Sequence, residues 1–127
     1  MRLRFLGIST GKDGCPTLYD TDRQTYVVQG WRVSDPAVRA RSGLQVGETC
    51  VEVPAHLMTF LEEPRDSHIG DDRCPYLVTE KGTYVISGPE ITDQETLSQM
   101  DVPDHETAVE VPKRLMVEVA RETVWSG

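Results

Sequence analysis

The stretch Thr25-Tyr26-Val27-Val28-Gln29-Gly30 returns later in the chain as Thr83-Tyr84-Val85-Ile86-Ser87-Gly88. The offset of 58 residues holds without a gap, since Glu48–Pro54 is matched by Glu106–Pro112. Over Thr25–Met58, 13 of 34 positions are identical to their counterparts, whereas about 2 would be expected from ordinary residue frequencies. The chain therefore contains two diverged copies of one unit.

The match continues upstream of these strands at a slightly different spacing. Cys15-Pro16-Thr17-Leu18 is matched by Cys74-Pro75-Tyr76-Leu77 at an offset of 59. This spacing predicts that one residue is missing from the turn that follows.

Each copy has the same predicted order of elements. Alternating β-branched and aromatic residues predict three strands per copy, at Thr17–Thr21, Thr25–Gln29 and Thr49–Val53 and at Tyr76–Glu80, Thr83–Ser87 and Thr107–Val111. A long polar connection separates the second and third strands. Pro54 and Pro112 then suit the first turn of a helix, whose apolar stripe would contain Leu57, Met58, Phe60 and Leu61, or Leu115, Met116 and Val119. The prediction is an α+β protein, a tandem repeat of two β-β-β-α units packed as a pseudo-two-fold pair.

The copies differ at their edges. Arg2–Leu6 alternates like an amphipathic strand, and only Ser67–Gly70 stands in that place in the second copy. The polar segment Glu62–Asp66 contains a proline and predicts a junction, so the first copy would span residues 1–63 and the second copy residues 64–127. A unit of about 60 residues buries a marginal core. We therefore expect the fused chain to imitate a homodimer of single-copy units.

Composition places the chain among globular proteins. Of its 127 residues, 38% are hydrophobic and 27% are charged. No run approaches the roughly 18 apolar residues that span a bilayer, and the first residues lack the apolar run of a signal peptide. Cys15, Cys50 and Cys74 form an odd set without a CxxC pair, which favours reduced, unligated thiols. We expect a cytoplasmic protein that does not bind membranes and is a monomer or a weak homodimer.

The net charge of −8 is divided unevenly between the copies. Residues 1–63 contain 7 Lys/Arg and 8 Asp/Glu, a net charge of −1, whereas residues 64–127 contain 6 and 13, a net charge of −7. A surface this acidic repels phosphate backbones, so direct nucleic-acid binding is not expected. It would attract a basic protein surface, although the charge could also serve only solubility.

Three stretches resemble one family of small uncharacterised proteins from streptomycetes and related actinobacteria, whose members are often single-copy. The stretches are Met1-Arg2-Leu3-Arg4-Phe5-Leu6-Gly7, the run Pro16–Trp31, and Asp104-His105-Glu106-Thr107 with the Val109-Glu110-Val111-Pro112 that follows. The resemblance implies a genomic context near helix-turn-helix regulators of developmental and toxin–antitoxin-like loci, and it implies no activity. The chain departs from the family pattern at two positions, each in one copy only. In the first copy Val46-Gly47-Glu48-Thr49 lacks the histidine, and in the second copy Pro89 replaces the tryptophan. If either residue binds something in the family, only one half of this chain retains it.

The chain contains no known catalytic motif. It lacks a phosphate loop, GxGxxG, HExxH and GxSxG. The paired Cys15 and Cys74 have no histidine at ligand spacing, so no metal or cofactor is expected, and a nucleophilic pair of Cys74 with His105 has no local support. Glu52 and Glu110 alternate with valines, which predicts carboxylates that face solvent rather than an acid–base pair.

Candidate partner contacts come from hairpin ends and from the acidic connection. Trp31 follows Gly30 and could be a lid on the core or an anchor for a partner. The other candidates are Tyr26 and Tyr84 beside the same hairpins, Asp22 and Arg23 at the first hairpin tip, and the acidic residues Asp93, Glu95 and Asp101.

These observations favour a non-enzymatic protein. We expect a regulatory accessory that binds a protein partner, either a helix-turn-helix regulator or another basic protein. The alternative is a small-molecule binding module that uses the cleft between the copies, with Trp31, Tyr26 and Tyr84 at the seam. An enzyme ranks third.

Overall fold

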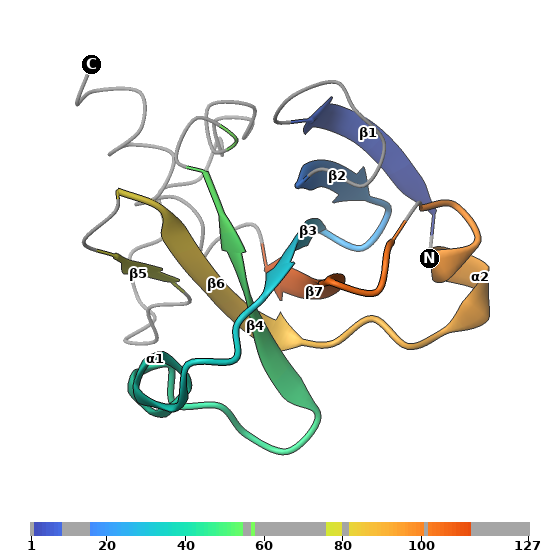
Figure 1. Ribbon diagram of the computed structural model, residues 1–127. Coiled ribbons are helices and arrows are strands. Elements are labelled where there is room, and N and C mark those ends of the chain that lie inside the picture. The colour runs from blue at the N-terminus through green and yellow to red at the C-terminus, as the bar shows by residue number, and fades with distance from the viewer. Residues whose placement is uncertain are drawn as a thin grey trace.

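The computed structural model describes residues 2–8, 16–54, 57, 76–79, 82–100 and 102–112. These residues form seven strands and two short helices (Figure 1). In chain order they are β1 (Leu3–Ile8), β2 (Thr17–Thr21), β3 (Thr25–Arg32), α1 (Pro36–Arg41), β4 (Glu48–Val53), β5 (Tyr76–Val78), β6 (Tyr84–Pro89), α2 (Gln94–Leu97) and β7 (Glu106–Pro112).

The fold is mostly antiparallel sheet, so the predicted α+β pair of β-β-β-α units is wrong. The described part of the second copy has the order β-β-α-β, and the first copy has the same order after the additional strand β1. In both copies the helix lies in the polar connection, where no element was predicted. Both helices begin at an aspartate cap, since Asp35 accepts a hydrogen bond from the backbone N–H of Ala37 and Asp93 from that of Thr96, each at 3.0 Å. The helices predicted after Pro54 and Pro112 fall outside the described residues, apart from the buried Leu57.

The predicted strands are present. β2 has the predicted bounds, β3, β4, β6 and β7 overlap their predicted ranges, and β1 overlaps the Arg2–Leu6 prediction. The offset of 59 is wrong for β5, because Leu18 pairs with Val28 while Tyr76 pairs with Ile86. Both partners therefore differ by 58, and no residue is missing from the turn. The proposed junction at Glu62–Asp66 and the segment Ser67–Gly70 lie outside the described residues.

The two copies exchange strands with each other. β3 of the first copy pairs with β7 of the second, and β6 of the second copy pairs with β4 of the first. Tyr26 pairs with Val111, and adding 58 to the first number while subtracting 58 from the second gives Tyr84 and Val53, which also pair. The smaller contacts lie within one copy and are also equivalent, since Arg32 pairs with Val51, and adding 58 to both numbers gives Glu90 and Val109, which form a bridge. Each hairpin is thus completed by a strand of the other copy.

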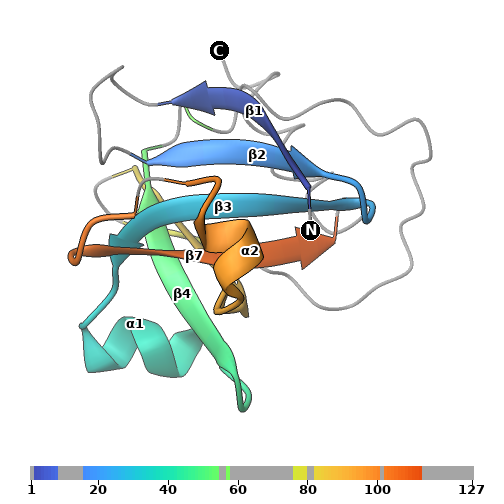
Figure 2. The same cartoon turned by 90° about the vertical axis from the view of Figure 1, so that its right-hand side faces the viewer.

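The exchanged strands form two groups that are joined at both ends. One group is β1-β2-β3-β7 and the other is β5-β6-β4. Figure 2 shows the first group side by side, with β4 running across its direction. β3 pairs with β4, and Glu90, directly after β6, bridges Val109 of β7, so pairing runs in a closed circuit through these four strands.

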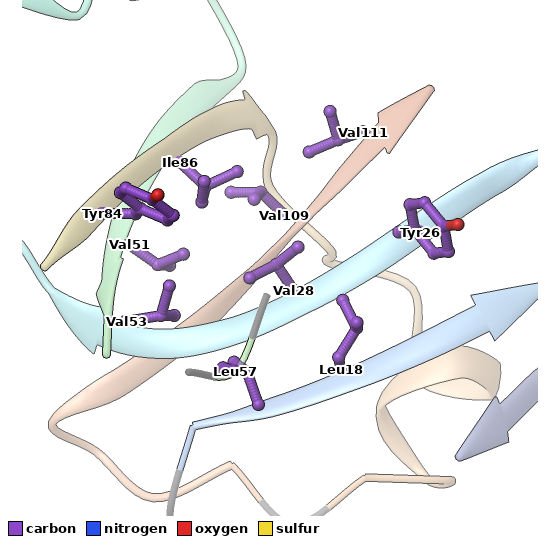
Figure 3. Packing of buried hydrophobic residues seen from close by; sticks show 10 residues of the cluster. All are labelled: Leu18, Tyr26, Val28, Val51, Val53, Leu57, Tyr84, Ile86, Val109 and Val111. Carbon is purple, nitrogen blue, oxygen red and sulfur yellow. The ribbon is translucent and has the colours of Figure 1, made fainter. Parts of the chain in front are cut away.

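The main core lies between the two groups and draws on both copies. Four pairs of equivalent residues form most of it, and Figure 3 shows their side chains converging from β3, β4, β6 and β7: Tyr26 and Tyr84, Val28 and Ile86, Val51 and Val109, Val53 and Val111. Leu18 and Leu57 complete the cluster. Fully burying such an aliphatic side chain contributes roughly 1.5–3 kcal/mol, and here neither copy can bury its set without the other.

Each helix covers the outer face of one group. α2 lies over the first group, where Leu97 packs with Val27, Ile91 and Ala108. α1 lies over the second group, where Val38 packs with Val33, Cys50 and Val85. The two small clusters are equivalent, since Val27 and Val85, Ile91 and Val33, and Ala108 and Cys50 each differ by 58.

Gly30 and Gly88 stand where an exchanged strand approaches another backbone closely. A Cβ on Gly30 would lie 2.7 Å from the carbonyl oxygen of Glu52 and from Cγ1 of Val53. A Cβ on Gly88 would lie 2.6 Å from the carbonyl oxygen of Glu110. Only glycine allows both crossings at these distances.

Replacing either glycine should therefore destabilise the protein. We expect Gly30→Ala and Gly88→Ala each to lower the free energy of unfolding by about 1–3 kcal/mol, because backbone must move to admit the methyl group. Urea denaturation followed by circular dichroism measures the change. Gly43→Ala is the control, since Gly43 has φ +63° but nothing within 4 Å, and it should cost only the backbone strain of roughly 1–2 kcal/mol. A crossing substitution without any loss of stability would contradict the packing argument.

Separated halves should fail to fold alone and should recover structure when mixed. In residues 1–63, β3 lacks β7 and β4 lacks β6, so we expect that fragment to be unstable or self-associated. Mixing it with residues 64–127 should give a 1:1 complex with the circular dichroism spectrum of the intact chain. Light scattering after size-exclusion chromatography measures the outcome. A cooperatively folded monomer of residues 1–63 would show that the exchange is not required.

Candidate functional site

The matched carboxylates Glu52 and Glu110 tie the two copies together. Thr83 donates its hydroxyl to Oε2 of Glu52 at 2.6 Å, and Thr25 donates to Oε2 of Glu110 at 2.7 Å. In Glu110 only 14% of the side chain is exposed, and the guanidinium of Arg23 lies 3.5 Å from the same oxygen. The prediction that these carboxylates face solvent is therefore wrong, because the other copy supplies a donor to each. They stabilise the exchanged ladders.

The three aromatic candidates do not form one surface. Tyr26 and Tyr84 belong to the main core, with 2% and 7% of their surface exposed. Trp31 is 37% exposed at the end of β3, where it pairs with both Glu52 and Glu106. None of the three lines either of the two hollows described below.

The first hairpin tip is exposed, as predicted for Asp22 and Arg23. Both residues nevertheless contact other parts of the protein. Asp22 accepts a hydrogen bond from the backbone N–H of Arg2, and Arg23 forms an ion pair with Glu110. Gln24 completes the turn with φ +61°, at the position where the second copy has Gly82 with φ +81°.

α2 presents the acidic candidates Asp93 and Glu95, both of which are exposed. Asp93 caps the helix, and the hydroxyl and backbone N–H of Thr96 donate to its carboxylate. These hydrogen bonds lower the pKa of Asp93 below its ordinary value. Glu95 follows in the first turn. Asp101 lies outside the described residues.

α1 occupies the equivalent place and carries the opposite charge. Its last turn contains Arg39 and Arg41, and its first turn contains no acidic residue. Arg39 donates to the carbonyl of Val33 at 3.1 Å, whereas Arg41 is exposed. The same scaffold position thus holds a basic helix on one side and an acidic helix on the other.

A hollow of about 600 Å³ lies beside α2. Leu97, Met100 and Pro103 give it apolar walls, and the charged residues on its lining are Arg32, Glu90, Asp104 and Glu106. Three of these four are acidic. The arrangement favours a cationic group that also has an apolar part.

The most buried charged group of this hollow is Glu106. Its side chain is fully buried, it accepts a hydrogen bond from Nε2 of Gln29 at 2.7 Å, and Nε2 of the exposed His105 lies 3.8 Å from its other oxygen. The equivalent residues Ser87 and Glu48 are only partly buried. This feature belongs to one side of the molecule alone, and the sequence analysis missed it because Gln29 and Glu106 are 77 residues apart.

Arg32 and Glu90 are equivalent residues that face each other. The guanidinium and the carboxylate are 3.7 Å apart, and both side chains are partly exposed. Thr107 donates to Glu90 at 2.6 Å, and Nε of Arg32 donates to the carbonyl of Asp104 at 3.0 Å. Sequence reasoning could have found the opposite charges from the offset, but it could not place the two residues in contact.

A second hollow, of about 710 Å³, lies between α1 and the strands β4, β5 and β6. It is lined from both copies, with Arg32, Val38 and Arg41 from the first and Leu77 and Val85 from the second. Its volume falls within the range of about 300–1,000 Å³ that is usual for small-molecule sites.

Other classes of site receive no support from the described part of the chain. It contains no group of three or more His, Cys, Asp or Glu residues that could hold a metal ion. Among its helices none is both long and apolar enough to cross a bilayer. Cys50 is a buried free thiol, while Cys15 and Cys74 lie outside the described residues.

Comparison of the chain with protein-family models, curated proteins and solved structures found no match. The resemblance to the actinobacterial family therefore stays a prediction.

Cys50 should be protected from thiol reagents. Burial raises the pKa of its thiol, and the nearby charge of Arg39 opposes this only in part. In a Cys15→Ser, Cys74→Ser variant we expect labelling at pH 8 to be on the order of 100-fold slower than in urea, because reaction requires local opening. The rate should rise with pH as the thiolate forms. Equal rates in the folded and unfolded protein would show that Cys50 is accessible.

Proposed function

We propose that this protein is a non-enzymatic regulatory accessory that binds a basic protein partner through α2. The observation that carries the proposal is the opposite charge of α1 and α2 at equivalent places on a shared scaffold. The residues that are identical in the two copies include core residues, the two glycines at the close backbone approaches, the threonine–glutamate pairs that join the copies, and the aspartate caps. The exposed residues of the helices differ. A retained scaffold with a changed surface is what a new contact would require.

The hollow beside α2 supports the same partner chemistry. A lysine or arginine side chain could place its apolar stem against Leu97 and Met100 and its charge near Glu90 and Asp104. Trp31 adds an exposed aromatic side chain at the end of β3, and aromatic residues are enriched at protein contacts. A helix-turn-helix regulator or another basic protein fits this chemistry, and the proposed location is the cytoplasm.

A second candidate function is small-molecule binding between the copies. The hollow beside α1 supports it, because both copies contribute to its lining. The seam proposed earlier from Trp31, Tyr26 and Tyr84 is replaced by this hollow, since the two tyrosines lie in the core.

Neutralising α2 should slow association with the basic partner. We expect Asp93→Asn with Glu95→Gln to reduce the association rate several-fold at low salt and to flatten its salt dependence, because exposed charges act mainly on the encounter. Asparagine keeps the cap of α2, so the helix is retained. Stopped-flow or surface-plasmon measurements with a partner recovered by affinity capture give the rates.

The matched control is Asp22→Asn with Asp35→Asn, which removes two charges at the hairpin tip and at the equivalent cap of α1. It should leave the rate nearly unchanged. Equal slowing by both double variants would mean that net charge, rather than the α2 surface, attracts the partner. No slowing by either would mean that the acidity serves solubility.

A further inference from the structure

We propose that the hollow beside α1 binds a small apolar carboxylate whose charged end meets Arg41. This inference rests on the second candidate function, small-molecule binding between the copies, and names the chemistry of the ligand. It concerns a different surface from the α2 contact.

The floor of the hollow accepts an apolar group. Val33, Val38, Leu77 and Val85 line it, and all four belong to the cluster under α1. Val33 directly follows β3, and the other three residues belong to α1, β5 and β6, so the exchange of strands brings the four together. An apolar ligand body lying on this floor would be removed from water without any rearrangement of the fold.

The acidic residues of the hollow already have donors from the protein. Asp35 accepts the hydrogen bond from the backbone N–H of Ala37 that caps α1. Glu52 accepts the hydroxyl of Thr83. Two acidic and two basic residues line the hollow, Asp35 and Glu52 against Arg32 and Arg41, so its preference depends on which of these charges lacks a partner in the protein.

The arginines of the hollow offer the opposite property. Arg41 is exposed and makes no ion pair with another residue of the described part of the chain. The guanidinium of Arg32 is already engaged, because its Nε donates to the carbonyl of Asp104 and it lies beside Glu90. A guanidinium binds a carboxylate through two parallel N–H donors, which is stronger than a neutral hydrogen bond. The guanidinium of Arg41 beside the apolar floor therefore suits an anion with an apolar body.

The test uses the intact protein and three probes with one apolar body: 4-phenylbutyrate, 4-phenylbutanol and 4-phenylbutylamine. Two-dimensional ¹H–¹⁵N NMR titrations give dissociation constants and locate the shifts. We expect the carboxylate to bind saturably at the millimolar level or tighter, with shifts at Val38, Leu77 and Val85. The alcohol and the amine should bind at least about tenfold more weakly, the loss expected when one charge-assisted hydrogen-bonded pair is removed.

Two variants and one control assign the site. Arg41→Gln should weaken the carboxylate about tenfold and leave the alcohol unchanged, because only the charged partner is removed. Ala37→Phe fills the hollow from an exposed helical position and should weaken all three probes. Arg23→Gln removes the same charge at the distant hairpin tip and should change nothing.

The outcomes separate the two levels of the proposal. Equal binding of the three probes, all lost in Ala37→Phe, would overturn the carboxylate inference and leave small-molecule binding in place. Binding of no probe at millimolar concentration would overturn both. Carboxylate binding that Arg23→Gln weakens as much as Arg41→Gln would show unspecific attraction and overturn the inference.

Discussion

The structure depends on the pairing of β3 with β7 and of β6 with β4 in one shared register. Because each ladder joins the two copies, the elements that follow each hairpin pack against strands of the other copy. The core lies between the exchanged strands, α1 covers the second hairpin, and α2 covers the first. A change that breaks one ladder would remove core contacts from both copies, so the halves are expected to unfold together.

The positions that stayed identical in the copies can be understood from this exchange. Gly30 and Gly88 allow close crossing of the backbones, and the Thr–Glu pairs join each hairpin to the strand that completes it. Asp35 and Asp93 cap the helices. Each of these residues has the same structural role as its counterpart, so the same side chain suits both places. The exposed residues of the helices meet no such constraint, and there the copies differ in charge.

Much of the strand pattern could be predicted from the sequence, because alternation and turn residues are local signals. The helices could not be found by periodicity, since four and six residues are too few to show it. Only Asp35-Pro36 carried a usable start signal. A repeat shows which residues are equivalent but not which copy pairs with which, so the sequence could not predict the exchange. For that reason Glu52 and Glu110 were assigned to solvent, Tyr26 and Tyr84 to an open seam, and the contact of Gln29 with Glu106 was missed.

Fusion gives this arrangement a freedom that a homodimer lacks. In a symmetric dimer each substitution appears twice, so both helices would carry the same charge, and a residue near the symmetry axis would face its own copy. Here the equivalent residues Arg32 and Glu90 face each other with opposite charges, and α1 and α2 have become basic and acidic. An exposed pair of this kind contributes only about 0–1 kcal/mol to stability, so its main consequence lies elsewhere. It makes the two ends of the scaffold chemically different, which allows a carboxylate site beside one helix and a basic protein contact beside the other.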